Sequence, residues 1–141
     1  MPRRMEIHWP DFDVTLTADL LDDENPKLCE RLWQALPFET LPMHSMGAGK
    51  IFKVPIPITL RPTPEAKLGF MPDQPPGTIL YCIGMGFFLI FGKPVVEPFT
   101  LLRIAMIPEK ELEKLNSVVP ELEDAFWFTK KVNKVIFRKQ E

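Results

Sequence analysis

His44 is the residue whose type and position most favour chemistry in this sequence of 141 residues. It stands beside Ser45 at the end of a predicted strand, and the loop 47–49 and Lys50 follow it. An imidazole changes protonation near neutral pH, so His44 is a candidate catalytic acid or base, and Lys50 is a candidate for holding an anionic substrate. The alternative is that His44 is a structural residue, hydrogen-bonded within an apolar region.

The loop itself, Gly47-Ala48-Gly49-Lys50, has some features of a phosphate-binding loop. Successive backbone amides beside a lysine bind anions in such loops. The segment lacks the full spacing of a phosphate-binding loop and the helix that follows one, which favours a plain turn.

Metal and cofactor chemistry finds little support in the residue pattern. His8 is the only other histidine, and no pair of carboxylates lies at a ligand spacing from either histidine. Cys29 and Cys82 are too far apart for a CxxC motif, so we expect two reduced thiols, no metal and no cofactor.

Four further residues complete the predicted ligand-binding set. Tyr81, the only tyrosine, lies in the middle of an apolar strand, where its hydroxyl either points into a pocket or anchors the core. Arg103 interrupts another apolar strand; it reaches the surface, pairs with a buried acid or receives an anionic ligand. Met46 and Phe52 lie close to His44 in the sequence and are predicted to border the same pocket.

The scaffold for these residues is centred on two apolar runs, 78–83 and 87–91, which are separated by Gly84-Met85-Gly86. The runs have strand length, and glycine adopts the positive φ angles of a tight reversal, so the pattern predicts a β-hairpin. Neither run alternates apolar with polar residues. Both faces of the hairpin should therefore be covered, as in a closed barrel.

The N-terminal part predicts two half-buried strands and a helix. Apolar residues alternate with polar residues over 5–9 and again over 12–20. Asn25 and Pro26 are typical of a helix start, and residues 27–36 have one apolar face, so we expect Asn25 to be the N-cap.

The remaining segments predict short strands, loops and helices. We expect strands at 40–45, 50–57, 100–107 and 135–137, and helices at 108–115 and 120–131. The proline-rich stretch from Pro55 to Pro76 predicts a long loop with a short strand at 56–60; it is either a binding rim or a rigid connection. Trp127, in a run of three aromatic residues, is expected to be partly exposed or in a subunit contact, which favours a homo-oligomer.

Composition bounds the class of protein. Apolar residues make up 45% and charged residues 26%, and the length fits one globular domain over residues 1–141. The formal net charge of −2, with both signs interspersed, argues against nucleic acid or an anionic membrane as the partner. The sequence lacks a secretory signal and an apolar run of membrane-spanning length, so we expect a cytoplasmic protein.

The order of the predicted elements resembles the cyclophilin fold. The stretch Asp22 to Phe38 resembles in particular small bacterial cyclophilin-like proteins of uncharacterised function, in which a similar helix precedes a strand that carries a histidine. In that family an arginine and then a Gly-Glu pair follow the histidine. Met46 and Gly49-Lys50 occupy those positions here.

The resemblance implies an eight-stranded antiparallel barrel closed by helices, and it raises prolyl isomerisation as a function. That chemistry depends on an arginine near the histidine, which this chain lacks, so isomerase activity is disfavoured. We therefore expect a cyclophilin-like barrel that binds a small metabolite near His44. The alternative is a small-molecule enzyme in which His44 acts as acid or base.

Overall fold

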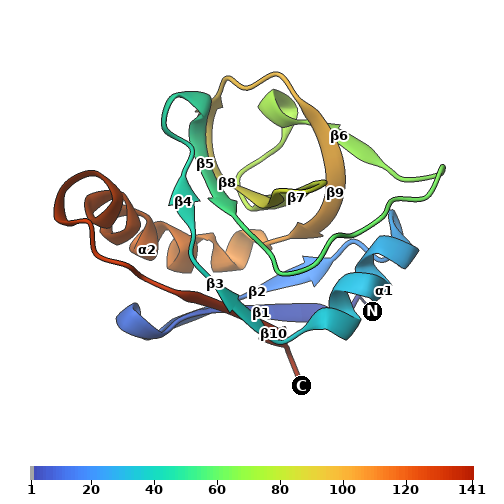
Figure 1. The fold of residues 1–141 in the computed structure, drawn as a ribbon, viewed down its shortest axis with the longest axis horizontal. Coiled ribbons are helices and arrows are strands. Elements are labelled where there is room, and N and C mark those ends of the chain that lie inside the picture. The colour runs from blue at the N-terminus through green and yellow to red at the C-terminus, as the bar shows by residue number, and fades with distance from the viewer. Residues whose placement is uncertain (1) are drawn as a thin grey trace.

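The protein folds around one antiparallel sheet that curls on itself, as a computed structural model describes for residues 2–141 (Figure 1). The sheet has ten strands in the order β3-β10-β1-β2-β9-β7-β8-β5-β4, with β6 paired to β9. The strands are β1 Arg4–Trp9, β2 Val14–Leu20, β3 Phe38–Thr40, β4 Met43–His44, β5 Gly49–Val54, β6 Leu68–Phe70, β7 Thr78–Cys82, β8 Gly86–Val95, β9 Thr100–Met106 and β10 Val135–Lys139. The predicted mainly β, barrel-like fold is confirmed, with ten strands where the resemblance implied eight.

Helices cover the sheet at two places (Figure 1). The α-helices are α1 Pro26–Ala35 and α2 Leu112–Asp124, and the short helical turns are η1 Pro10–Phe12, η2 Met46–Ala48, η3 Met71–Asp73, η4 Glu109–Glu111 and η5 Ala125–Thr129. Helix α1 buries Leu28, Cys29 and Leu32 in the main core, as its predicted apolar face requires. Helix α2 packs against β2 and β8.

The hairpin of β7 and β8 crosses the centre of the sheet, as predicted. Ile79 and Tyr81 enter the main core, whereas Leu80 and Phe88 enter a smaller apolar cluster on the opposite face. Because both faces are covered, neither strand needs to alternate apolar with polar residues. The turn closes with a hydrogen bond from the Met85 amide to the Cys82 carbonyl.

The prediction of one continuous strand over 40–45 is wrong. Pro42 separates β3, which pairs with β10, from β4, which pairs with β5. Proline has no amide hydrogen to continue a ladder, so the chain leaves one edge of the sheet and joins the other. Leu41 and Pro42 thus connect the two edge strands covalently, and this connection places His44 beside β5.

The proline-rich segment is a loop, as predicted, but its strand lies elsewhere. Residues 56–60 form no strand, because Pro55 and Pro57 cannot donate to one; the Leu60 amide instead donates to the Tyr81 hydroxyl at 2.8 Å. Strand β6 follows later in the loop and was not predicted.

Asn25 occupies the predicted N-cap position before Pro26, but its side chain does not cap the helix. Its buried side chain accepts from the Lys67 amide at 2.7 Å and donates to the carbonyl oxygens of Lys67 and Arg103. The amide group therefore holds the proline-rich loop against β9 and is not available to the helix N-terminus.

The C-terminal region forms one helix where two were predicted. Helix α2 continues through Pro120, which is exposed, and the carbonyl of Asn116 that loses a partner there belongs to an exposed residue. The helix then widens into the π-helical turn η5, so helical structure ends at Thr129 rather than at the predicted residue 131.

Candidate functional site

His44 lies at the edge of the sheet, where β4 pairs with β5. In the antiparallel register His44 faces Phe52 directly, and Phe52 in turn faces Leu89 on β8. Directly paired residues project from the same face of a sheet. The His44 side chain therefore joins an apolar surface and is only 7% exposed.

Both ring nitrogens of His44 have hydrogen-bond partners. The Met46 amide donates to Nδ1 at 2.9 Å, and Nε2 lies 3.1 Å from Oε2 of Glu123 on α2. Because Nδ1 accepts a hydrogen bond, we assign the proton of the neutral ring to Nε2, which donates it to Glu123. Met46 reaches this position with a φ of 56°, in the left-handed region that side-chain-bearing residues seldom adopt.

Four aromatic rings surround the imidazole. The ring centroids of Phe52 and Phe91 both lie 5.7 Å from that of His44, in edge-on arrangements. Those of Trp127 and Phe126 lie at 5.9 and 6.1 Å and belong to η5. The site is thus an aromatic enclosure built from β5, β8 and the π-helical turn, a type of turn often found at functional sites.

Glu123 connects this enclosure to solvent. Its side chain is 29% exposed, and Oε2 lies 4.0 Å from Nζ of Lys50, so Lys50 lies next to the carboxylate that contacts His44. Sequence reasoning missed Glu123. The usable signal was its spacing, because Phe126 and Trp127 follow it at i+3 and i+4 and so share its helix face.

The cavity directly at His44 is small. It has a volume of about 60 Å³, roughly the room taken by two water molecules, and Phe52, Phe126 and Lys131 help to line it. A wider pocket of about 430 Å³ shares Ala125, Lys131 and Asn133 with this cavity. The wider pocket opens towards Asp11 and is large enough for a metabolite.

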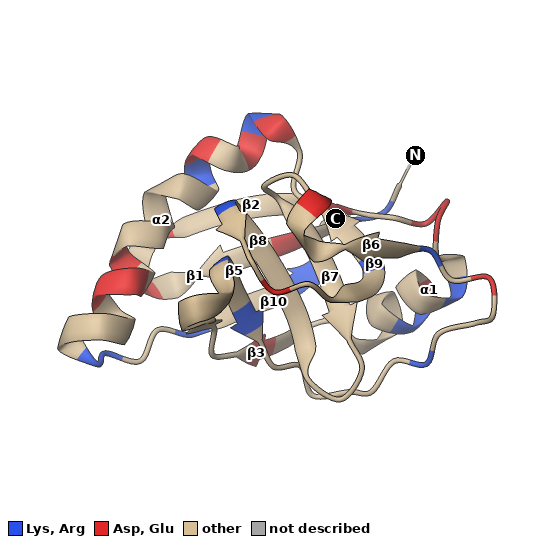
Figure 2. Ribbon diagram, turned by 90° about the horizontal axis from the view of Figure 1, so that it is seen from above, with Lys and Arg blue, Asp and Glu red and all other residues tan. Residues whose placement is uncertain are grey.

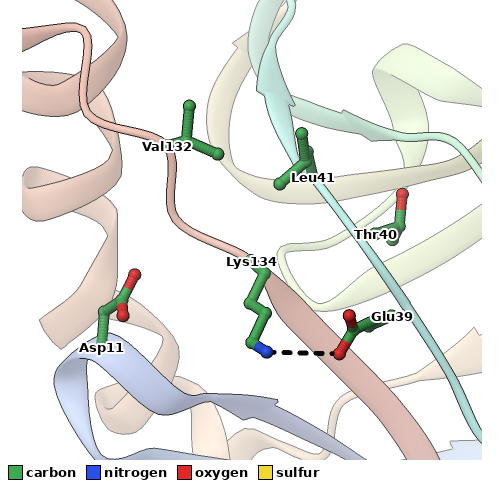
Figure 3. A pocket seen from close by; sticks show the side chains of 6 residues that line it. All are labelled: Asp11, Glu39, Thr40, Leu41, Val132 and Lys134. Carbon is green, nitrogen blue, oxygen red and sulfur yellow. Dashed lines mark ion pairs between the residues drawn. The ribbon is translucent and has the colours of Figure 1, made fainter.

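A third depression adjoins the wider pocket and has a volume of about 380 Å³. Figure 3 shows Val132 and Leu41 on opposite walls, Asp11 to one side, and the ion pair between Lys134 and Glu39, whose Nζ and Oε2 atoms lie 3.4 Å apart. The irregular segment 130–134, which precedes β10, therefore lines both the wider pocket and the third depression.

Tyr81 and Arg103, which were predicted to border the same pocket, lie elsewhere. The Tyr81 hydroxyl accepts from the Leu60 amide, and the residue lines a separate apolar depression. Arg103 pairs with Glu24, with Nε 2.8 Å from Oε1, and also donates to Gln74. Of the predicted set, the structure brings Met46, Lys50 and Phe52 to His44.

Charge is distributed over the surface without a dominant patch. Figure 2 shows acidic and basic residues interspersed, with both signs along α2. In the part of the chain that the structure describes, no group of three or more histidine, cysteine, aspartate or glutamate side chains is placed to hold a metal ion. No helix within residues 2–141 has the length and apolar character needed to cross a membrane.

Comparison with known proteins gives a similarity of fold. No protein-family model matches the chain, and no curated protein matches it. A solved structure, described as the structure of McbB in complex with tryptophan, is similar with a TM-score of 0.87 and 23% sequence identity. The match covers 96% of this chain and 44% of that chain, so this chain spans less than half of its length.

Proposed function

We propose that this protein binds a small molecule at the His44 site, and that the ligand carries an aromatic ring and an amino group. The observation that supports the proposal most strongly is the hydrogen bond between His44 and Glu123 within a ring of aromatic side chains. Aromatic rings with a few fixed polar groups are typical of ligand sites.

The partners of His44 define what each group offers a ligand. Since both imidazole nitrogens are engaged, His44 acts as a positioning residue, and the carboxylate that it orients is the polar group available to a ligand. A carboxylate accepts hydrogen bonds from an ammonium group, and the faces of Phe126 and Trp127 attract a cation or stack on a planar ring.

The size of the cavities sets where the ligand enters. The cavity at His44 is too small for an aromatic metabolite, whereas the adjoining pocket of about 430 Å³ is wide enough. We infer that the ligand occupies the wider pocket and displaces the side chain of Phe126, which lines the adjoining cavity at His44, to reach Glu123. The tryptophan in the McbB structure supports a ligand of this class for a similar fold.

The proposal is tested by isothermal titration calorimetry with L-tryptophan as the probe. The expected result is saturable binding at one site. Substitution Glu123→Gln preserves shape and removes the charge, and it should weaken binding about tenfold or more, because a hydrogen bond to a charged group is worth about 1.5–3 kcal/mol.

Glu113→Gln is the matched control, because Glu113 is an exposed residue of the same helix. It should leave affinity unchanged. Absence of saturable binding up to about 5 mM, or equal weakening by both substitutions, would contradict the proposal.

An enzyme that uses His44 in acid–base chemistry is the second candidate, favoured by the hydrogen bond between the imidazole and a carboxylate. In this arrangement Glu123, which is more exposed, is the group nearer to a substrate. Turnover of an amine substrate with a pH–rate profile altered by His44→Ala would favour this candidate over a binding protein.

Membership of the cyclophilin-like group also stays a proposal, supported by the order of strands and helix around His44.

A further inference from the structure

The separate apolar depression that Tyr81 lines is found where strands β7 and β9 diverge. It shares no lining residue with the cavity at His44. The last paired residues are Tyr81 and Leu102; beyond them β7 enters its hairpin turn, while β9 continues alongside β6. The gap between the diverging strands has a volume of about 350 Å³. Buried Tyr81 and Leu102 line it from within.

The wall of this depression is apolar. Leu68 and Ile83 line it with 56% and 54% of their surfaces exposed, and Pro62 and Leu101 line it as well. Among the described residues that line it, none is charged. Large aliphatic side chains that are exposed around a concave surface are typical of a binding site.

Few polar groups are available to a ligand there. The Tyr81 hydroxyl already accepts a hydrogen bond from the Leu60 amide. The Thr100 hydroxyl and the Cys82 thiol remain, and neither carries a charge when the thiol is protonated; burial raises the pKa of Cys82, which favours that form. A charged ligand would lose its hydration without gaining a partner.

We propose that this depression is a second binding site, which takes an uncharged apolar small molecule. The volume lies at the lower end of the range for small-molecule sites. An extended peptide is a poorer fit, because the neighbouring edge strand β6 has three residues and offers little backbone to pair with.

Cys82 provides a direct reporter of occupancy. It is a free, half-buried cysteine in the wall of the site, whereas Cys29 is fully buried, and burial raises the pKa of Cys29 to about 12. Alkylation of the native protein by iodoacetamide should therefore modify Cys82 and spare Cys29. A ligand in the depression covers the Cys82 thiol and slows its modification.

The experiment uses N-phenyl-1-naphthylamine, a neutral dye whose fluorescence rises in apolar sites. We expect saturable binding at one site, displacement by octanol and not by octanoate, and at least a tenfold slower alkylation of Cys82 at saturation. Leu68→Asp and Ile83→Asp should each weaken dye binding at least tenfold. Both side chains are more than half exposed, so the fold should persist, as circular dichroism would verify.

Val96→Asp is the control, since Val96 is equally exposed but does not line the depression. It should leave dye binding intact. Non-saturable binding, unchanged alkylation of Cys82 at saturation, equal displacement by octanoate, or equal weakening by all three variants would overturn the proposal. Because His44 and Glu123 lie outside this site, these outcomes are independent of tryptophan binding.

Discussion

At the scale of single residues, the buried polar side chains of the site and of the core are held by specific hydrogen bonds. His44 is fixed by the Met46 amide on one side and Glu123 on the other. Asn25 and Glu111 are likewise buried with their polar atoms hydrogen-bonded. A buried polar group that loses its partner still carries the cost of its desolvation. Substitution of such residues should therefore lower the stability of the protein measurably.

Substitution Asn25→Ala should destabilise the protein by about 2–4 kcal/mol. It removes three hydrogen bonds: the Lys67 amide and the Arg103 carbonyl lose their side-chain partner, whereas the Lys67 carbonyl keeps the hydrogen bond from the Arg103 amide. Urea unfolding followed by circular dichroism measures the change. Asn116→Ala, at an exposed position of α2, should stay within about 0.5 kcal/mol, and an equally small effect at Asn25 would show that it does not hold the loop.

Glu111 should contribute stability that depends on pH. Burial acts to raise the pKa of its carboxyl, but the hydrogen bonds from Lys114 and Thr17 outweigh burial, and the pKa lies below its usual range. A carboxyl with a lowered pKa in the folded state stabilises it above the unfolded pKa of about 4.3, and the contribution is lost as the pH falls through the folded pKa.

The measurement is the free energy of unfolding of wild type and Glu111→Gln at several pH values. Wild type should be more stable by about 1 kcal/mol at pH 7, with the difference shrinking below about pH 4. A difference that stays constant down to about pH 3 would contradict the assignment.

Residue types alone identified part of the site. His44 and Phe52 could be placed together because they lie on strands joined by a short loop. Tyr81 and Arg103 could not, because their positions depend on the β7–β9 register and on an ion pair with Glu24, 79 positions away in the sequence. The spacing of Glu123 relates it only to the aromatic residues that follow it on the helix; its contact with His44, 79 positions away, has no local signal.

At the scale of elements, local patterns predicted the hairpin and α1 but not the C-terminal helix. Periodicity and glycine placement act within a few residues, which is enough for β7, β8 and α1. Pro120 was taken as a helix start, whereas the helix tolerates it because the affected carbonyl belongs to exposed Asn116. The strand expected at 56–60 failed because prolines remove the donors that a strand needs.

The hairpin should depend on Gly86. Its φ is +129°, and a Cβ there would collide with the carbonyl oxygen of Val54. Gly86→Ala should therefore destabilise the protein by about 2–4 kcal/mol, through backbone strain and forced separation of β5 from β8. Thermal and urea unfolding measure the effect.

Gly47→Ala is the control for this substitution. A Cβ at Gly47 meets no atom within 4 Å in the described part of the chain. It should change stability by less than about 0.5 kcal/mol. Equal effects of the two substitutions would show that the close approach at Gly86 is not needed for the fold.

At the scale of the whole molecule, the curled sheet was predictable from a hairpin covered on both faces, but the connection between its two end strands was not. Leu41 and Pro42 join β3 at one end of the sheet to β4 at the other, whereas the predicted contiguous strand over 40–45 would have stayed at one edge. The high similarity of fold to the McbB structure at 23% identity indicates that this arrangement tolerates extensive sequence change.

We also expect the protein to self-associate. Phe128 and Val132 are 79% and 73% exposed, close to the η5 turn. We predict a homo-oligomer through this surface, detected by sedimentation velocity, and Phe128→Ser should shift it towards monomer. A wild-type monomer at about 100 μM would contradict the prediction.

Binding of a ligand at the His44 site is tested by an NMR titration of the ¹⁵N-labelled protein with L-tryptophan. We predict saturable shifts of the amides of residues 44–46 and 123–133, and their loss in Glu123→Gln but not in Glu113→Gln. Shifts confined to residues 62–68, 81–83 and 100–102, or no saturable shift up to about 5 mM ligand, would contradict it.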